Sequence, residues 1–346
     1  MMYIRRNRIP IPHGKRSKAA SRCHRSGEWT RAGYRAPACY VTNARPIVRA
    51  TFSAAPADLS SVTLLAETAA AIGGFAATNV AFAGGAASDV ALLTKSATTN
   101  CILEVVTNTL GKTDGHVLYT ILGEPVEPWN NAFGNKANAW ASALDIVCSN
   151  GWAKGCTNCD DAASAITKAI FDSGRFQYET NHGAPQLITA KGRFRLSKVI
   201  EIINKRQEQE VNCSDCARMT TSFANILGCS LYSSKMRQSF QLNPITAIGR
   251  DPWTPPGWGW SFKFHEVAWA GDCLATNHIY DACLLLDGDD SPSTHPHSPM
   301  YAVDIQFSDG SPSMPLVYKE RLTSPGSNGY DKCYPCPWEK QRVPIQ

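Results

Sequence analysis

The run Asn212-Cys-Ser-Asp-Cys-Ala-Arg-Met-Thr-Thr-Ser-Phe-Ala-Asn-Ile-Leu-Gly228 carries the start and stop signals of one helix. Asn212 is a favourable N-cap. Asp215, three residues later, can reach back to the cap and complements the positive end of the helix dipole. Gly228 is a favourable stop. The pattern predicts a helix of roughly four turns that begins at Cys213.

Cys213 takes the first helical position, on a stripe of small residues that faces inward. The helix dipole and the unpaired N–H groups at that end favour the thiolate, which is the nucleophilic form of cysteine. The alternative is a small buried residue with a packing role only. Cys216, one turn along, is a rival for the same chemistry, and we favour Cys213 for its N-terminal placement.

Two predicted strands follow, the first with a histidine and the second with an acid. Residues 262–269 alternate so that His265 shares a face with Val267 and Trp269. In residues 277–286 the same alternation places Asp281 among apolar neighbours, where a carboxylate needs a partner.

The register of the two strands decides whether His265 and Asp281 meet. A two-residue turn would set His265 opposite His278 and turn Asp281 away, because a slip of one residue exchanges the faces. A connection of three or five residues puts Asp281 diagonal to His265 on one face. We predict the odd-length connection.

The order of these residues resembles the transglutaminase-like superfamily. The resemblance rests on the C-x-D-x-A pattern from Cys213 to Ala217, followed by His265 and Asp281 on strands, and it covers residues from about 140 to 286. It implies an α+β, papain-like catalytic domain in which a helix-borne cysteine packs on an antiparallel sheet. It also implies Cys213 as nucleophile, His265 as base and Asp281 as orienter.

The chain departs from the family pattern at three points. Cys216 stands where a bulky apolar residue is usual, Glu266 follows the histidine, and the oxyanion donor of the family, often Gln or Trp, has no clear counterpart. The spacing to Ala217 again favours Cys213 over Cys216.

Such a set of residues implies attack of a thiolate on a carbonyl, giving a thioester that water or an amine resolves. The substrate would be a protein or peptide, and no cofactor is needed. The alternative is a binding or structural protein that keeps the fold without turnover. Four tryptophans are candidates for substrate binding: Trp253, Trp258, Trp260 and Trp269.

The composition is that of a globular protein, since 43% of the 346 residues are hydrophobic and 18% are charged. We expect four parts: a basic, disordered extension (1–52), a small β domain of sandwich type (53–128), the transglutaminase-like domain (129–322) and a tail that packs irregularly or is mobile (323–346).

The formal net charge of +5 is unevenly distributed. Residues 1–50 hold twelve Lys and Arg against Glu28, which gives 12 − 1 = +11 and leaves 5 − 11 = −6 for the rest. This segment is a possible arm for nucleic acid or an anionic surface, with Trp29, Tyr34 and Tyr40 as stacking groups. The alternative is a dispensable extension or a mis-assigned start.

Neither a signal peptide nor a membrane-spanning segment is predicted. No hydrophobic core follows the early arginines, and residues 68–88, although uncharged, hold too many glycines for a membrane helix. We therefore expect a cytoplasmic protein.

The thirteen cysteines include three C-x-x-C pairs: Cys156/Cys159, Cys213/Cys216 and Cys333/Cys336. The first and third could hold a zinc ion if they converge, and the alternative is that each pair is reduced or locally disulfide-bonded. A redox role for the second pair is a further rival.

The loop from 287 to 299 also holds potential metal ligands: Asp289, Asp290, His295 and His297. Its prolines favour a solvated loop instead.

Overall fold

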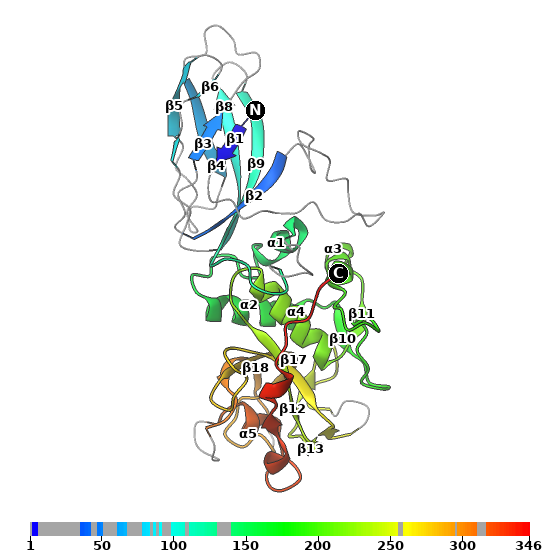
Figure 1. Ribbon diagram of the computed structural model, residues 1–346. Coiled ribbons are helices and arrows are strands. Elements are labelled where there is room, and N and C mark those ends of the chain that lie inside the picture. Colours follow the sequence, from blue (N-terminus) through cyan, green and yellow to red (C-terminus); the bar gives the residue numbers. More distant parts are fainter. Residues whose placement is uncertain are drawn as a thin grey trace. The chain divides into compact units, whose positions relative to one another are not determined.

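The structure is a computed structural model (Figure 1), and it describes residues 2–5, 35–42, 47–50, 61–67, 78–83, 86–87, 90–91, 98–107, 111–129, 140–254, 259–294, 296–309 and 316–346. Contacts group the chain into two units. Unit 1 comprises residues 1–125, 137–158 and 226–228, and unit 2 comprises 126–136, 159–225 and 229–346.

The described part of unit 1 contains two sheets and one helix. Strands β1 (Met2–Arg5), β3 (Ile47–Ala50) and β7 (Val90–Ala91) form one sheet. The other has the order β2 (Arg35–Val41), β9 (Gly111–Ile121), β8 (Thr99–Thr107), β4 (Ser61–Glu67), β5 (Thr78–Ala83) and β6 (Ala86–Ala87). The helix is α1 (Ala141–Val147).

Three of these strands come from the predicted extension 1–52, so its described stretches are regular structure. Its remaining residues, which include Trp29 and Tyr34, lie outside the described part. The disorder of the segment as a whole, its role as an arm and the four domain bounds stay predictions.

Unit 2 is built on a six-stranded antiparallel sheet. Its order is β14 (Thr246–Ala247), β17 (His278–Asp287), β16 (His265–Trp269), β12 (Tyr232–Arg237) and β19 (Tyr334–Pro335), and β18 (Pro299–Gln306) also pairs with β17. The helices are α2 (Cys159–Asp172), α3 (Leu196–Lys205), α4 (Cys213–Asn225) and α5 (Tyr318–Leu322). The expected α+β arrangement, with helices packed on an antiparallel sheet, is present.

Two smaller pairings complete unit 2. Strand β10 (Phe176–Tyr178) runs parallel to β11 (Gln209–Val211), which leads directly into α4. Strand β13 (Phe240–Gln241) pairs with β15 (Ser261–Phe262). The predicted strand 262–269 is thus interrupted at Lys263 and Phe264, between β15 and β16.

Helix α4 is the central helix of unit 2. It packs against α2 and against strands β12, β16 and β17 (Figure 1). Every residue of α4 except Arg218 is buried. A helix with small and apolar residues on nearly all sides is a core helix, so the first residue of α4, Cys213, begins inside the fold.

The tail 323–346 is described throughout and packs on β12 with mostly irregular backbone. Besides β19 it forms two short 3-10 turns, η1 (Tyr330–Lys332) and η2 (Pro337–Glu339). The Gln341 N–H donates to the carbonyl oxygen of Ser233 at 2.9 Å, and the Cys336 N–H donates to that of Lys235 at 2.9 Å.

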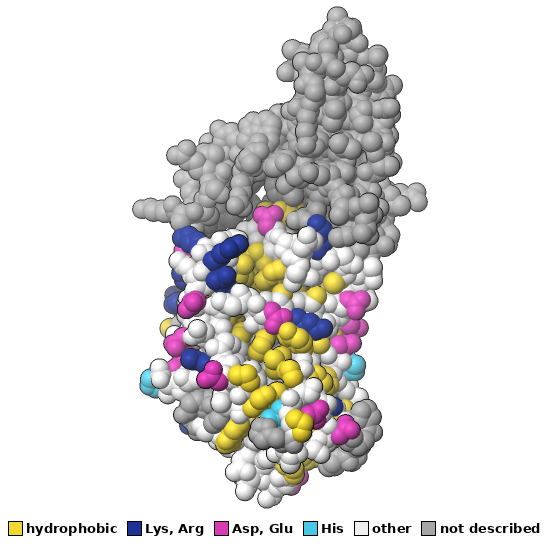
Figure 2. Space-filling view, turned by 180° about the vertical axis from the view of Figure 1, so that it is seen from behind, with side chains coloured by type: hydrophobic (Ala, Val, Ile, Leu, Met, Phe, Trp, Pro, Cys, Tyr) yellow, Lys and Arg dark blue, Asp and Glu magenta, His cyan; other side chains and the backbone are white. Residues whose placement is uncertain are grey.

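The face drawn in Figure 2 carries a strip of hydrophobic side chains bordered by charged groups of both signs. The large apolar side chains most exposed among the described residues are Trp260, Leu274, Tyr334 and Trp338. None of the described helices has the length and apolar character needed to cross a membrane.

Gly249 lies in a turn that packs directly against β10. Its φ is +66°, and an added Cβ would lie 2.5 Å from the carbonyl oxygen of Phe176 and 2.9 Å from the Gln177 Cα. Because backbone atoms cannot move aside cheaply, Gly249→Ala is expected to lower the free energy of unfolding by about 3 kcal/mol. Urea unfolding measures this loss.

Gly192→Ala is the matched control for Gly249→Ala. Gly192 has a similar φ of +71°, but an added Cβ there meets no atom within 4 Å. Only the left-handed backbone conformation is then penalised, at about 1 kcal/mol. Equal losses at the two positions would show that the contact with β10 is not the cause.

Candidate active site

The start of α4 has the cap that the sequence predicts. Asn212 Oδ1 accepts a hydrogen bond of 3.0 Å from the Asp215 N–H, and Asp215 Oδ2 accepts one of 3.2 Å from the Asn212 N–H. This reciprocal pair satisfies two backbone donors at the helix start. Cys213 follows the cap as the first residue of α4 and exposes 4% of its surface.

Asp215 also ties a neighbouring loop to the helix start. Its carboxylate accepts hydrogen bonds from the Gln186 N–H at 2.7 Å and the Leu187 N–H at 3.0 Å. Burial raises the pKa of Asp215 to about 6, against the lowering effect of these N–H donors. The Asn212 side chain adds a bond of 2.8 Å from Nδ2 to the Gly183 carbonyl oxygen. One carboxylate therefore fixes both the helix start and the loop beside it.

His265 and Asp281 are in contact. His265 Nε2 lies 2.9 Å from Asp281 Oδ2. Ala268 pairs with Tyr280 and Trp269 with Ile279, which places Asp281 diagonal to His265.

The connection between the two strands has the expected odd length. The Ala270 N–H bonds to the His278 carbonyl oxygen at 2.9 Å, so residues 271–277 form the connection, which is longer than the three or five residues predicted. His278 is not opposite His265. It is exposed and pairs with Asp304 at 2.7 Å.

The Asp281 carboxylate has two further donors. The Tyr318 hydroxyl donates to Oδ2 at 2.8 Å, and the Cys283 N–H donates to Oδ1 at 2.8 Å. Asp281 exposes 3% of its surface, so these contacts replace water around a buried charge. Tyr318 comes from α5 (Tyr318–Leu322) and was not predicted from the sequence.

His265 is fully buried, and the Phe262 ring stacks on its imidazole with centroids 4.9 Å apart and planes 6° apart. Burial lowers the pKa of His265, but the charge and hydrogen bond of Asp281 and the nearby Cys213 sulfur outweigh it and raise the pKa to about 10. The imidazolium is therefore the favoured form at neutral pH.

The two ring nitrogens of His265 have different surroundings. Nε2 faces Asp281, whereas Nδ1 is buried and has no partner at hydrogen-bond geometry among the described residues. Cys213 nevertheless acts on the pKa of this ring as a hydrogen-bonding neighbour. Since Nε2 is occupied, Nδ1 is the atom left for the thiol. Such contacts are often long in a protein without substrate.

Cys216, the rival of Cys213, lies against another thiol. Cys216 and Cys283 are hydrogen-bonding neighbours, and both are fully buried. Burial raises the pKa of both thiols, which disfavours the thiolate.

The candidate tryptophans that the structure describes differ in burial. Trp269 is fully buried and donates from Nε1 to the Ser234 carbonyl oxygen at 3.1 Å, so it belongs to the core. Trp260 exposes 39% of its surface, Trp253 is half-buried, and Trp258 lies outside the described residues. Substrate binding by these residues stays a prediction.

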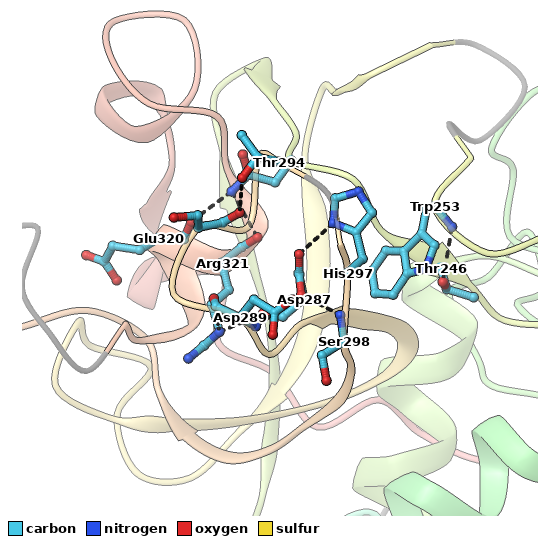
Figure 3. Close-up of polar contacts among 11 residues, drawn as sticks. Thr246, Trp253, Asp287, Asp289, Thr294, His297, Ser298, Glu320 and Arg321 are labelled. Carbon is cyan, nitrogen blue, oxygen red and sulfur yellow. Dashed lines mark hydrogen bonds and ion pairs between the residues drawn. The ribbon is translucent and has the colours of Figure 1, made fainter.

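Figure 3 shows a second histidine–carboxylate pair, which lies at the C-terminal end of β17. His297 Nδ1 lies 2.6 Å from Asp287 Oδ2, and the His297 and Trp253 rings pack with centroids 4.7 Å apart. The His297 side chain is only 2% exposed, so the expected solvated loop is wrong at this residue. The packing of Trp253 over the ring explains the burial. His295 lies outside the described residues.

In the described part of the chain, no three His, Cys, Asp or Glu side chains lie close enough together to hold a metal ion. A zinc site formed by the C-x-x-C pairs Cys156/Cys159 and Cys333/Cys336 stays a prediction. No disulfide is formed by the cysteines between residues 148 and 336, whose side chains the structure describes.

No family model matches the sequence, and no curated protein matches it either. Among solved structures, the chain is similar to the crystal structure of red sea bream transglutaminase, with a TM-score of 0.44 and 9% sequence identity. The similarity covers 73% of this chain and 49% of that one, so the chain spans about half the length of the transglutaminase.

Proposed function

We propose that the chain is a cysteine enzyme that transfers an acyl group or hydrolyses an amide or peptide, with Cys213 as nucleophile, His265 as base and Asp281 as orienter. The observation that carries the proposal is the contact of 2.9 Å between His265 Nε2 and Asp281 Oδ2, with Cys213 beside the same ring at the start of α4. A protein or peptide is the proposed substrate.

In the proposed reaction Cys213 starts as a thiolate beside the protonated His265 ring, and this thiolate attacks the carbonyl carbon of the substrate. The C–N bond then breaks, the leaving amine takes the proton from His265, and a thioester remains on Cys213. Water or a second amine attacks the thioester, gives its proton to His265 and releases the thiolate. Proton transfer by His265 would contribute roughly a hundred-fold to ten-thousand-fold.

The start of α4 offers a way to stabilise the oxyanion. Backbone N–H groups in the first turn of a helix have no intrahelical acceptor, and the helix dipole favours negative charge there. Because Cys213 is the first residue of α4, an oxyanion formed on its acyl group would develop beside these donors. This would replace the Gln or Trp donor that the sequence lacks.

The alternative is a binding or structural protein with the same fold. The observation that favours it is burial: Cys213, His265 and Asp281 expose 4%, 0% and 3% of their surfaces. A site that never opens could not admit a carbonyl group. Thiol reactivity separates the two proposals.

Iodoacetamide at neutral pH is expected to modify Cys213 ahead of the other cysteines, because the His265 imidazolium stabilises its thiolate. His265→Ala is expected to slow this reaction about tenfold or more. Peptide mass spectrometry over time measures the rate at each cysteine. Cys216→Ser is the control and should leave the rate at Cys213 unchanged. Equal labelling of several cysteines, or an unreactive Cys213, would favour the binding protein.

A further inference from the structure

Tyr318 shares one acceptor oxygen with His265. Its hydroxyl lies 2.8 Å from Asp281 Oδ2, the same atom that lies 2.9 Å from His265 Nε2. Tyr318 and His265 are fully buried, and Asp281 exposes 3% of its surface. With so little water present, the phenol and the imidazole are the groups that divide the charge on this oxygen.

Tyr318 acts on Asp281 as a neutral donor. Burial, and after it the charge of Asp281, raise the pKa of Tyr318 well above its ordinary value, so the phenol keeps its proton. A hydrogen bond from a neutral hydroxyl to a carboxylate is about twice as strong as one between neutral groups.

The helix that carries Tyr318 is fixed to the same strand as Asp281. Arg321 Nη1 donates to the carbonyl oxygens of Asp287 at 2.6 Å and Asp289 at 3.0 Å, at the end of β17 (Figure 3). Asp281 and Asp287 both lie on β17. Helix α5 therefore contacts that strand through Tyr318 and again through Arg321, which holds the phenol at a set distance from Asp281.

The titratable groups that act on Asp281, His265 or Tyr318 come from several elements. They are Cys213 and Cys216 on α4, Tyr178 on β10, Cys283 on β17, and Cys333 before β19. Tyr318 differs from these groups by its side-chain hydrogen bond of 2.8 Å to the Asp281 carboxylate.

We propose that Tyr318 is a positioning residue: it aims the Asp281 carboxylate at His265 and limits how strongly that carboxylate holds the imidazolium. A donor to the carboxylate stabilises the negative charge and leaves less of it for the ring. Without the phenol, the proton would stay on the His265–Asp281 pair to higher pH. The effect on catalysis rests on the proposed function, whereas the effect on the His265 proton does not.

Tyr318→Phe is therefore expected to move the pH at which the His265 ring loses its proton upward, by up to about one unit. Folding gains from this proton below about pH 6.5, and the gain is lost as pH rises through the folded pKa of about 10, so the variant should extend it to higher pH. NMR titration of protein with ¹⁵N-labelled histidine measures the transition, and His265→Gln assigns the signal.

A second replacement tests the same bond in the opposite direction. Replacing Tyr318 with 3,5-difluorotyrosine keeps the size but makes the hydroxyl a stronger donor, so the His265 transition is expected to move downward. Tyr301→Phe is the control, because the Tyr301 hydroxyl bonds to Asp172 at 2.7 Å on the surface and should leave His265 unchanged.

An unchanged His265 transition in both Tyr318 proteins would overturn the proposal. If Tyr318→Phe does not fold, the fluorinated protein decides alone. If the wild-type protein shows neither acyl transfer nor hydrolysis, the proposed function is wrong. The titration of His265 still tests the role of Tyr318 in that case. In an active enzyme, kcat should fall about tenfold and the basic limb of its pH profile should shift. A role in folding alone would not move that limb.

Discussion

Cys213→Ser is expected to abolish amide cleavage and amine transfer, with a loss of at least about a thousand-fold. Serine keeps the size and the helix start but not the nucleophile, because its hydroxyl is far less acidic than a thiol and the His265–Asp281 pair already holds a proton firmly. The measurement uses an N-blocked glutamine peptide with a fluorescent primary amine, and follows both the amide product and the released ammonia. His265→Ala should cause a loss of similar size, since the two residues act as one unit.

Cys216→Ser is the matched control for Cys213→Ser, since the two cysteines lie one turn apart on α4. It breaks the contact with Cys283 but leaves Cys213 and His265 in place. We expect activity within about threefold of the wild type, with a small loss of stability from a buried hydroxyl. The opposite pattern, with Cys213→Ser active and Cys216→Ser inactive, would move the nucleophile to Cys216.

Asp215→Ala is expected to lower the free energy of unfolding by about 4 kcal/mol, because it leaves three backbone N–H groups, two of them buried, without their acceptor. These groups belong to Asn212, Gln186 and Leu187. The loop should separate from the start of α4, so iodoacetamide should modify Cys213 more slowly. Urea unfolding and the labelling rate measure the two effects.

Asp172→Ala controls for the loss of a carboxylate. Asp172 is exposed and accepts hydrogen bonds from the Tyr301 hydroxyl, so its removal should cost less than about 1 kcal/mol. A loss at Asp215 no larger than the loss at Asp172 would show that the three N–H groups find other acceptors.

Several features of the site could be predicted from the sequence, because each depends on few neighbouring residues. The cap of α4 involves Asn212 and Asp215, which are three residues apart, so the side chains and the backbone donors meet locally. The meeting of His265 with Asp281 depends on the parity of one connection. Parity is a yes-or-no property, and the apolar neighbours of both residues indicated which answer to expect.

Tyr318 and Trp269 show where this reasoning stops. Tyr318 lies 37 residues from Asp281 on a five-residue helix, and no local pattern announces which strand such a helix will contact. Trp269 shares the predicted face of His265, yet its indole N–H bonds to Ser234 of β12 in the core. The alternation of residues in one strand predicts which side chains share a face, but not which neighbouring strand covers that face.

The start of α4 and the odd number of residues between β16 and β17 could be predicted from the sequence alone, and they led to the candidates Cys213, His265 and Asp281. These follow from hydrogen bonds and alternation within short stretches of chain. The surroundings of these residues depend on how the elements pack: the Tyr318 phenol contacts Asp281, the Cys283 thiol lies against Cys216, and the Asp287–His297 pair is buried. Burial and long-range hydrogen bonds depend on which elements pack together. The periodicity of the sequence predicts only that a residue faces inward, and not which residue it will contact.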